Sequence, residues 1–315
     1  MASAWSIWPV PAAPGVTSAP MADYSLWVLE YASQTRVPSG DILYGSYAGP
    51  PRRMPYCYVV LRSKNHVAMV DVGYNNADHG RSLALSYGVE HWHDPRRVLA
   101  LCGLRPEDVG TVFITHAHFD HFGNVEAFPN AHFHIARQEI ERSLWALSQP
   151  ERMRFLASAI DPGDLTRAAT LAAAGRLTLV DKDMADVLPG IDLHLAPDTH
   201  SFASIWVRLR NDGRRESQDC WVLAGDLIYS FDNIGGLATG IDAGAPFHPI
   251  GIAVGSQENL LHASEAMLTA VAYERRRVVP VHEEALARVY PTREVAPGLA
   301  ISEICLADGA VSMVR

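Results

Sequence analysis

A hydrophobic run from Val109 to Thr115 leads directly into the hexapeptide His-Ala-His-Phe-Asp-His at residues 116–121. This H-x-H-x-D-H motif constrains the fold most, because it places four metal-binding side chains just after one predicted β-strand. A turn at that point can direct His116 and His118 toward one position, while Asp120 and His121 face a second. Neutral imidazoles and carboxylates are common ligands of zinc and related divalent ions. The motif therefore predicts a metal site at the C-terminal end of a strand.

Three further residues follow short hydrophobic runs in the same way. His200 follows residues 193–196, Asp226 follows residues 221–225, and His282 follows residues 278–281. With the motif they make five histidines and two aspartates, enough for two metal ions that share a carboxylate. Two other His-x-His pairs, at 91–93 and 132–134, are interpreted as non-ligands because surface strands readily produce this spacing. The predicted ligands are His116, His118, Asp120, His121, His200, Asp226 and His282.

The order of the predicted elements favours a layered α/β fold. Residues 1–22 form a Pro/Ala-rich arm containing Trp5 and Trp8, and residues 23–315 are predicted to form a single domain. Strands are expected in both halves of this domain, with a helical insertion at about 137–175 between them. A helix is expected from Ser256 to about Tyr273, and residues 278–281 are predicted to be the last core strand.

Composition excludes several classes of protein. There are 26 Lys plus Arg against 35 Asp plus Glu, a formal charge of −9, without the clustered cations that nucleic-acid binding needs. No hydrophobic run is long enough to span a membrane, and the N-terminus lacks the basic region of a signal peptide. The four cysteines are far apart and form no Cys-x-x-Cys pair, which argues against a disulfide framework. We therefore expect a cytoplasmic protein with a small-molecule substrate.

These motifs resemble those of the metallo-β-lactamase superfamily from about Leu26 to His282. The resemblance includes Asp71 in Val-Asp-Val-Gly, Asp226 in Ala-Gly-Asp and His282 in Pro-Val-His. It implies a four-layer αββα sandwich with two divalent metal ions. Zinc is the expected ion, with manganese or iron as alternatives. Asp71 is implied to be structural. The family's usual loop around the ligand at His200 is replaced here by residues 199–204, Thr-His-Ser-Phe-Ala-Ser.

The resemblance also assigns the ligands to two ions. His116, His118 and His200 would bind one ion, Asp120, His121 and His282 would bind the other, and Asp226 would bridge them.

Asp226-Leu227-Ile228-Tyr229 resembles the N-acyl homoserine lactonases and the related pyridoxolactone-opening enzymes, as do Phe119 within the motif and the stretches 123–124 and 128–131. This branch implies a homodimer in which the N-terminal arm covers hydrophobic surface. Relative to those lactonases, residues 231–254 look expanded.

The implied activity is hydrolysis of a cyclic ester by a hydroxide that bridges the two metal ions. Tyr229 would donate a hydrogen bond to the oxyanion, Asp120 would carry the proton to the leaving alkoxide, and Phe119 would line the substrate pocket. A cyclic amide or imide hydrolase and a phosphoester hydrolase remain alternatives on the same metals. A non-catalytic metal-binding protein is the alternative from a different class.

Overall fold

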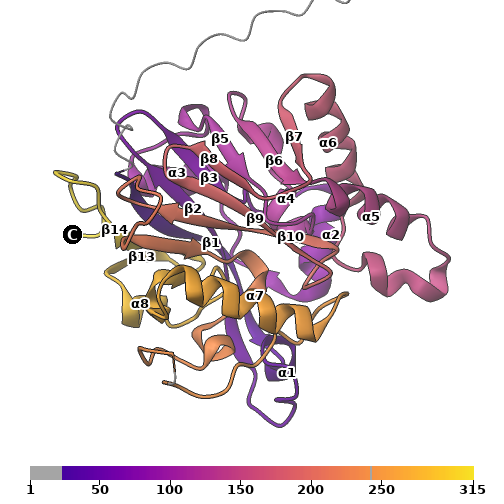
Figure 1. Cartoon of the computed structure of the whole chain (residues 1–315). Coiled ribbons are helices and arrows are strands. Elements are labelled where there is room, and N and C mark those ends of the chain that lie inside the picture. The colour runs from indigo at the N-terminus through magenta and orange to yellow at the C-terminus, as the bar shows by residue number, and fades with distance from the viewer. Residues whose placement is uncertain (1–22, 242) are drawn as a thin grey trace, which may run out of the picture.

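The structure, a computed structural model, describes residues 23–241 and 243–315 as two β-sheets packed face to face between helices (Figure 1). The strands are β1 (Ser25–Val37), β2 (Arg52–Arg62), β3 (Val67–Val70), β4 (Val89–Glu90), β5 (Thr111–Phe113), β6 (His132–Ala136), β7 (Leu177–Val180), β8 (Met184–Leu188), β9 (Ile191–Pro197), β10 (Ala203–Arg210), β11 (Cys220–Leu223), β12 (Val278–Val279), β13 (Thr292–Ala296) and β14 (Leu299–Cys305). The α-helices are α1 (Ser39–Ile42), α2 (Asp78–Tyr87), α3 (Pro95–Leu99), α4 (Phe119–Phe122), α5 (Arg137–Leu147), α6 (Pro162–Ala173), α7 (Gln257–Ala270) and α8 (Leu286–Val289).

The larger sheet has the order β13-β14-β1-β2-β3-β5-β6-β7, with β4 paired to β1. Its central strands are hydrophobic along nearly their whole length because both faces of the sheet are covered. From β3 to β7 the strands run parallel, so their carboxyl ends lie at the same edge of the sheet. The smaller sheet has the order β12-β11-β10-β9-β8.

Helices cover the outer faces of the two sheets. Helix α3 contacts β1 and α6 contacts β7 on the larger sheet, whereas α7 contacts β9 and β11 on the smaller one. Strands β6 and β10 are in contact between the sheets, and one continuous hydrophobic core includes residues of both. This arrangement is the four-layer αββα sandwich that the sequence predicted.

The C-terminal strands correct one prediction. Residues 278–281 were expected to be the last core strand, but β12 contains only Val278–Val279, and β13 and β14 follow it. Strand β14 lies next to β1, with Leu29 opposite Ile301. Its hydrophobic pattern is interrupted by Glu303, which is buried because its carboxylate accepts hydrogen bonds from Trp27 Nε1 (3.4 Å) and from the Met313 backbone amide (3.0 Å).

The helices expected over residues 137–175 are present as α5, a 3₁₀ helix over Glu151–Ala157, and α6 (Figure 1). Helix α6 begins where the Asp161 side chain accepts a hydrogen bond from the Gly163 amide (2.8 Å) and Pro162 occupies the first turn. Alpha-helix α5 and the 3₁₀ helix project from the right-hand side of the sandwich in Figure 1. Leu144 and Phe155 on this projection are exposed.

Residues 1–22, the predicted arm with Trp5 and Trp8, lie outside the described part of the chain. In the part that is described, no helix is both long enough and hydrophobic enough to cross a membrane.

Candidate metal centre

Each predicted ligand lies just beyond the end of a strand or in the short helix that follows. His116 and His118 follow β5, while Asp120 and His121 lie in α4. From the smaller sheet, His200 follows β9, Asp226 follows β11 and His282 follows β12. The seven side chains, which come from strand ends of both sheets, therefore lie together in two groups that share Asp226. All except His118 are buried.

The first group consists of His116, His118, His200 and Asp226. His118 Nδ1 lies 2.9 Å from His116 Nε2 and 3.0 Å from His200 Nε2. Asp226 Oδ2 completes the group, at 3.3 Å from His200 Nε2 and 3.7 Å from His116 Nε2. Three imidazole nitrogens and one carboxylate oxygen thus converge on one point, as in a four-coordinate site.

The second group consists of Asp120, His121, His282 and the other oxygen of Asp226. Asp226 Oδ1 lies 3.1 Å from His282 Nε2 and 3.2 Å from His121 Nε2. Asp120 Oδ2 lies 3.4 Å from His121 Nε2. The two oxygens of Asp226 therefore face different groups, which is the geometry of a carboxylate that can bridge two cations.

Hydrogen bonds at the opposite ring nitrogen orient four of the histidines. His121 Nδ1 lies 2.8 Å from Asp71 Oδ2, and His116 Nδ1 lies 3.0 Å from Thr115 Oγ1. The backbone carbonyls of Ile252 and Pro55 accept from His200 Nδ1 and His282 Nδ1, each at 2.7 Å. Such contacts fix both the tautomer and the ring orientation of a metal-binding histidine. They leave each Nε2 directed at the centre.

Asp71 lies under the site. Its backbone has a left-handed φ of 64°, and Asp71 Oδ1 accepts a hydrogen bond from the Thr115 amide (2.7 Å). Because its carboxylate is occupied by Thr115 and His121, Asp71 belongs to neither potential metal group. This geometry agrees with the structural role that the sequence assigned to it.

Burial controls the protonation of the first group. Burial lowers the pKa of His118 to about 3 and also lowers the pKa values of His116 and His200, which favours neutral rings. In the second group, burial also opposes the charged form of His121, but the nearby carboxylates of Asp226 and Asp120 raise its pKa above the usual value. A divalent cation would take the place of the proton that these carboxylates stabilise on His121.

The donor set fits divalent metal ions. His121 Nε2, His282 Nε2 and Asp226 Oδ1 are buried, yet none of them has a hydrogen-bond partner. A buried polar atom without a partner is costly, and here three of them point at one another across about 3 Å. A cation bound by all three would satisfy them together. The His91/His93 and His132/His134 pairs lie outside both groups.

Glu139, on α5, is a supporting residue that sequence reasoning missed. It is fully buried, and its carboxylate accepts hydrogen bonds from the amides of Ala117 (3.0 Å) and Ala203 (2.7 Å). Ala117 lies between two predicted ligands, and Ala203 follows the loop that carries His200. Glu139 thus joins the two loops of the first group, although a lone glutamate in a helix gives no sequence signal of such a role.

A cavity of about 100 Å³ opens onto the metal centre. Phe119 and Tyr229 both line it, and Tyr229 packs with its ring centroid 5.0 Å from that of His282. Burial first, and then the Asp226 carboxylate, raise the pKa of Tyr229 well above its usual value, so the hydroxyl keeps its proton. From the helical insertion, Phe155 lines the cavity, whereas Trp145 does not.

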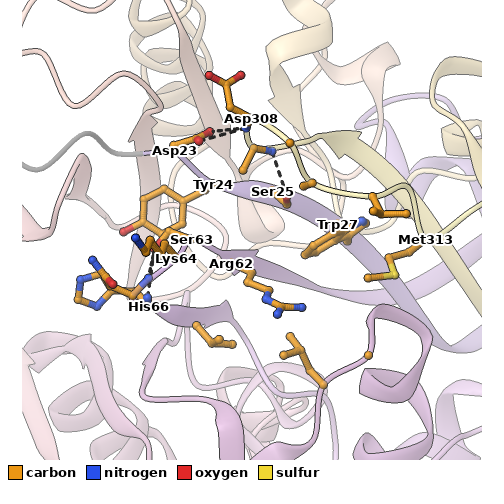
Figure 2. A pocket seen from close by; sticks show the side chains of 18 of the residues that line it. Asp23, Tyr24, Ser25, Trp27, Arg62, Ser63, Lys64, His66, Asp308 and Met313 are labelled. Carbon is orange, nitrogen blue, oxygen red and sulfur yellow. Dashed lines mark hydrogen bonds between the residues drawn. The ribbon is translucent and has the colours of Figure 1, made fainter.

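A larger cavity of about 1320 Å³ lies elsewhere, near the starts of β1 and β3 and the end of β2 (Figure 2). Tyr24, Arg62, Lys64 and His66 surround it, together with acidic residues such as Asp308. Figure 2 shows that the Asp308 amide donates to the Asp23 carboxylate. Its lining has charges of both signs and, among the described residues, includes neither potential metal group. Size alone therefore does not make it the reactive site.

The family model of the metallo-beta-lactamase superfamily matches residues 50–210. Probable metallo-hydrolases of Mycobacterium bovis and Mycobacterium tuberculosis are 37% identical over 59 residues, which is 19% of this chain and 19% of each relative. The chain therefore matches only about a fifth of the length of these curated relatives.

Solved structures match over much more of the chain at low identity. A quorum-quenching N-acyl homoserine lactone lactonase is 18% identical, with a TM-score of 0.58 over 84% of this chain and 94% of that chain. A probable metal-dependent hydrolase from Staphylococcus aureus is 16% identical, with a TM-score of 0.62 over 84% and 91%. AidC, a dizinc quorum-quenching lactonase, is 17% identical, with a TM-score of 0.57 over 89% and 94%. At this level of identity the matches show a shared fold.

Proposed function

This chain belongs to the metallo-β-lactamase superfamily, and from that premise we propose that it is a metal-dependent hydrolase that opens a cyclic ester. The observation that carries the proposal is the placement of Asp226, whose two oxygens face two separate groups of ligands beside a hydrophobic cavity. The lactonases among the structural matches support the choice of a lactone as substrate.

We assign His116, His118 and His200 to one ion, Asp120, His121 and His282 to the other, and Asp226 to both. Two divalent ions bound there, for which zinc is our first expectation and manganese or iron the alternatives, would lower the pKa of water toward about 7 and polarise an ester carbonyl.

The remaining chemistry is assigned to residues of this chain. Tyr229 donates its hydroxyl hydrogen to the oxygen that becomes negative as the ester carbonyl is attacked. Asp120 accepts the proton of the attacking hydroxide and delivers it to the leaving alkoxide, which gives a hydroxy acid as the product. Phe119, packed against Tyr87 with ring centroids 5.9 Å apart, forms one wall of the pocket.

The cavity lining favours a carbonyl substrate over a phosphoester. Among the described residues that line it there is no lysine or arginine to pair with a phosphate anion. The cavity is small, about 100 Å³, and lined mostly by hydrophobic side chains, which suits a small ring compound. A cyclic amide or imide hydrolase remains the second candidate, because such a ring has the same shape and the same carbonyl.

Metal analysis combined with a substrate screen tests the proposal. Protein purified without chelator is expected to contain about two equivalents of metal by elemental analysis. A pH-indicator screen of lactones, lactams, aryl esters and phosphotriesters should show the fastest acid release with lactones. A stable content near one equivalent that added Zn²⁺, Mn²⁺ or Fe²⁺ does not raise would contradict the binuclear centre. Faster turnover of lactams or phosphotriesters would contradict the substrate assignment.

We also propose that the protein is a cytoplasmic homodimer. The four free cysteines, three of them buried, suit a reducing compartment. The dimer proposal rests on the hydrophobic sequence of the arm, with Trp5 and Trp8. Deletion of residues 1–20 should halve the mass measured by light scattering. A monomer both before and after the deletion would contradict the interface.

A further inference from the structure

Asp41 is the one charged residue among the described lining of the metal-centre cavity that is not a proposed metal ligand. It lies in the short helix α1, next to hydrophobic lining residues such as Val37 and Ile252. Its side chain is half-buried, and within the described residues its carboxylate has neither a hydrogen bond nor an ion pair. The other charged lining residues, Asp120 and Asp226, already face histidines.

The backbone holds Asp41 in a fixed place relative to the metal centre. Its carbonyl oxygen accepts hydrogen bonds from the amides of Gly251 (2.9 Å) and Ile252 (3.2 Å). Gly251 packs so closely that a Cβ at this position would overlap the Gly40 carbonyl oxygen. Ile252 in turn accepts the hydrogen bond from His200 Nδ1. One short series of backbone contacts therefore connects Asp41 to a proposed ligand.

A half-buried carboxylate in such a wall has lost part of its hydration without gaining a partner. Burial accordingly raises the pKa of Asp41 above its usual value. A cation or an N–H donor placed against it would offset this cost, whereas a second anion would increase it. The wall is therefore selective by charge, although its remaining members are mostly hydrophobic.

We propose that Asp41 determines specificity by accepting hydrogen bonds from a protonated amine carried by the substrate, on a substituent away from the ester that is opened. This inference rests on the proposed function, because it names the class of cyclic ester that the site selects. The site then prefers cationic over neutral lactones and discriminates against anionic ones. An amide N–H would make a weaker contact of the same kind, because it carries no net charge.

A set of γ-butyrolactones that differ in one substituent tests the inference. The substituents are aminomethyl, N-acetylaminomethyl, ethyl and carboxymethyl, and the readout is the ratio of kcat/KM to that of the ethyl compound. The wild type should favour the aminomethyl compound most and the carboxymethyl compound least. In Asp41→Asn the aminomethyl ratio should fall about two- to fivefold, as expected for loss of a partly exposed ion pair. Preference for the N-acetylaminomethyl compound instead would overturn the assignment of an amine.

The control is Asp181→Asn, which removes the same charge from an exposed residue outside the cavity lining and should keep the wild-type ratios. Asp41→Ser serves as a second variant if the asparagine protein does not fold. Equal aminomethyl ratios in wild type and in the folded Asp41 variant would overturn the proposal, as would a preference for the carboxymethyl lactone.

A binding measurement separates this inference from the proposed reaction. Aminomethyl-tetrahydrofuran and ethyl-tetrahydrofuran have no ester to hydrolyse, so their dissociation constants can be compared by NMR titration. Tighter binding of the amine in wild type, lost in Asp41→Asn, supports the role of Asp41 even if no lactone is turned over. Lactone turnover without any such difference in binding would retain the hydrolase and reject the role of Asp41.

Discussion

At the scale of single residues, Asp226 connects the two halves of the metal centre. Its Oδ1 atom faces His121 and His282, while its Oδ2 atom faces His116 and His200. The nearby histidines lower the pKa of Asp226 despite burial, which by itself would raise it. The carboxylate is therefore ionised, as a bridging ligand must be.

Tyr229 allows a test of the proposed chemistry. If its hydroxyl stabilises an oxyanion that exists only in the transition state, Tyr229→Phe should lower kcat about ten- to a thousandfold with little change in KM. Steady-state kinetics on a lactone and on an aryl phosphotriester measure this loss, with metal analysis as the control. A loss limited to the lactone supports the role, whereas lower thermal stability with unchanged kcat would identify a packing residue.

Asp164 at the start of α6 provides a prediction about pH. Burial is the main cause that raises its pKa to about 8, while Asp164 Oδ1 accepts from Arg167 at 2.8 Å. The folded state therefore keeps a proton that the unfolded state releases near pH 3.8. Its contribution to stability is complete below that pH and decreases until about pH 8, by about 1.4 kcal/mol per pH unit.

Urea unfolding between pH 4 and 9 measures this effect. Asp164→Asn should remove this part of the slope, whereas Asp181→Asn, at an exposed position, should keep it. The same pH slope in wild type and Asp164→Asn would contradict the prediction.

At the scale of elements, the segment 231–254 is held to the body of the protein by Arg275. This buried guanidinium donates to the carbonyl oxygens of Ile234 (2.9 Å), Ala238 (2.6 Å), Gly240 (2.9 Å) and Ala243 (2.7 Å). Backbone carbonyls can accept all of these hydrogen bonds, so the loop needs no acidic side chain to bind the guanidinium. The described part of this segment, which looked expanded in the sequence, is thus joined to the body of the protein at four carbonyls, and its last residues, 252–254, line the cavity.

Loss of this contact should loosen the segment without unfolding the sheets. In Arg275→Met the four carbonyls lose a charged donor, and we expect amide hydrogen exchange in the described parts of residues 231–254 to accelerate at least about tenfold. Arg276→Met is the matched control, because Arg276 is the exposed neighbour. Equal exchange rates in the two variants would show that Arg275 does not hold the segment.

Elements of the site differed in how far the sequence could predict them. The proposed ligands could be picked out because they come just after hydrophobic strands, where polar residues are conspicuous. The carbonyls of Pro55 and Ile252 were not, since every residue has a backbone carbonyl and only the fold selects which one meets a histidine. Strand β14 was missed for a related reason, because Glu303 is buried by partners distant in sequence.

At the scale of the whole molecule, the metal centre lies where loops from both sheets meet. His116 and His121 come from the larger sheet, whereas His200 and His282 come from the smaller one. Metal ions bound between them would link the two halves of one shared core. The predicted single domain should therefore unfold in one transition whose midpoint depends on metal.

Removal of metal should lower the melting temperature of the whole chain. Ions bound only by the folded state add about 4 kcal/mol to stability when the free concentration is 1,000 times Kd. Differential scanning calorimetry with and without a chelator should show one transition that moves down by several degrees and returns when zinc is added. Two separate transitions, only one of them sensitive to chelator, would instead indicate independent domains.

The pairing of β14 with β1 has a consequence for synthesis of the protein. A hydrogen bond near this edge, from the Ala307 amide to Ser25 Oγ, joins residues 282 positions apart. At about 5–20 residues per second, the ribosome needs tens of seconds to reach β14 after β1 has emerged. During that interval one edge of β1 is not yet paired with β14, and an unpaired strand edge is a site of aggregation. A nascent chain stalled before residue 299 would therefore be a substrate for chaperones, even though every proposed metal ligand had already been made.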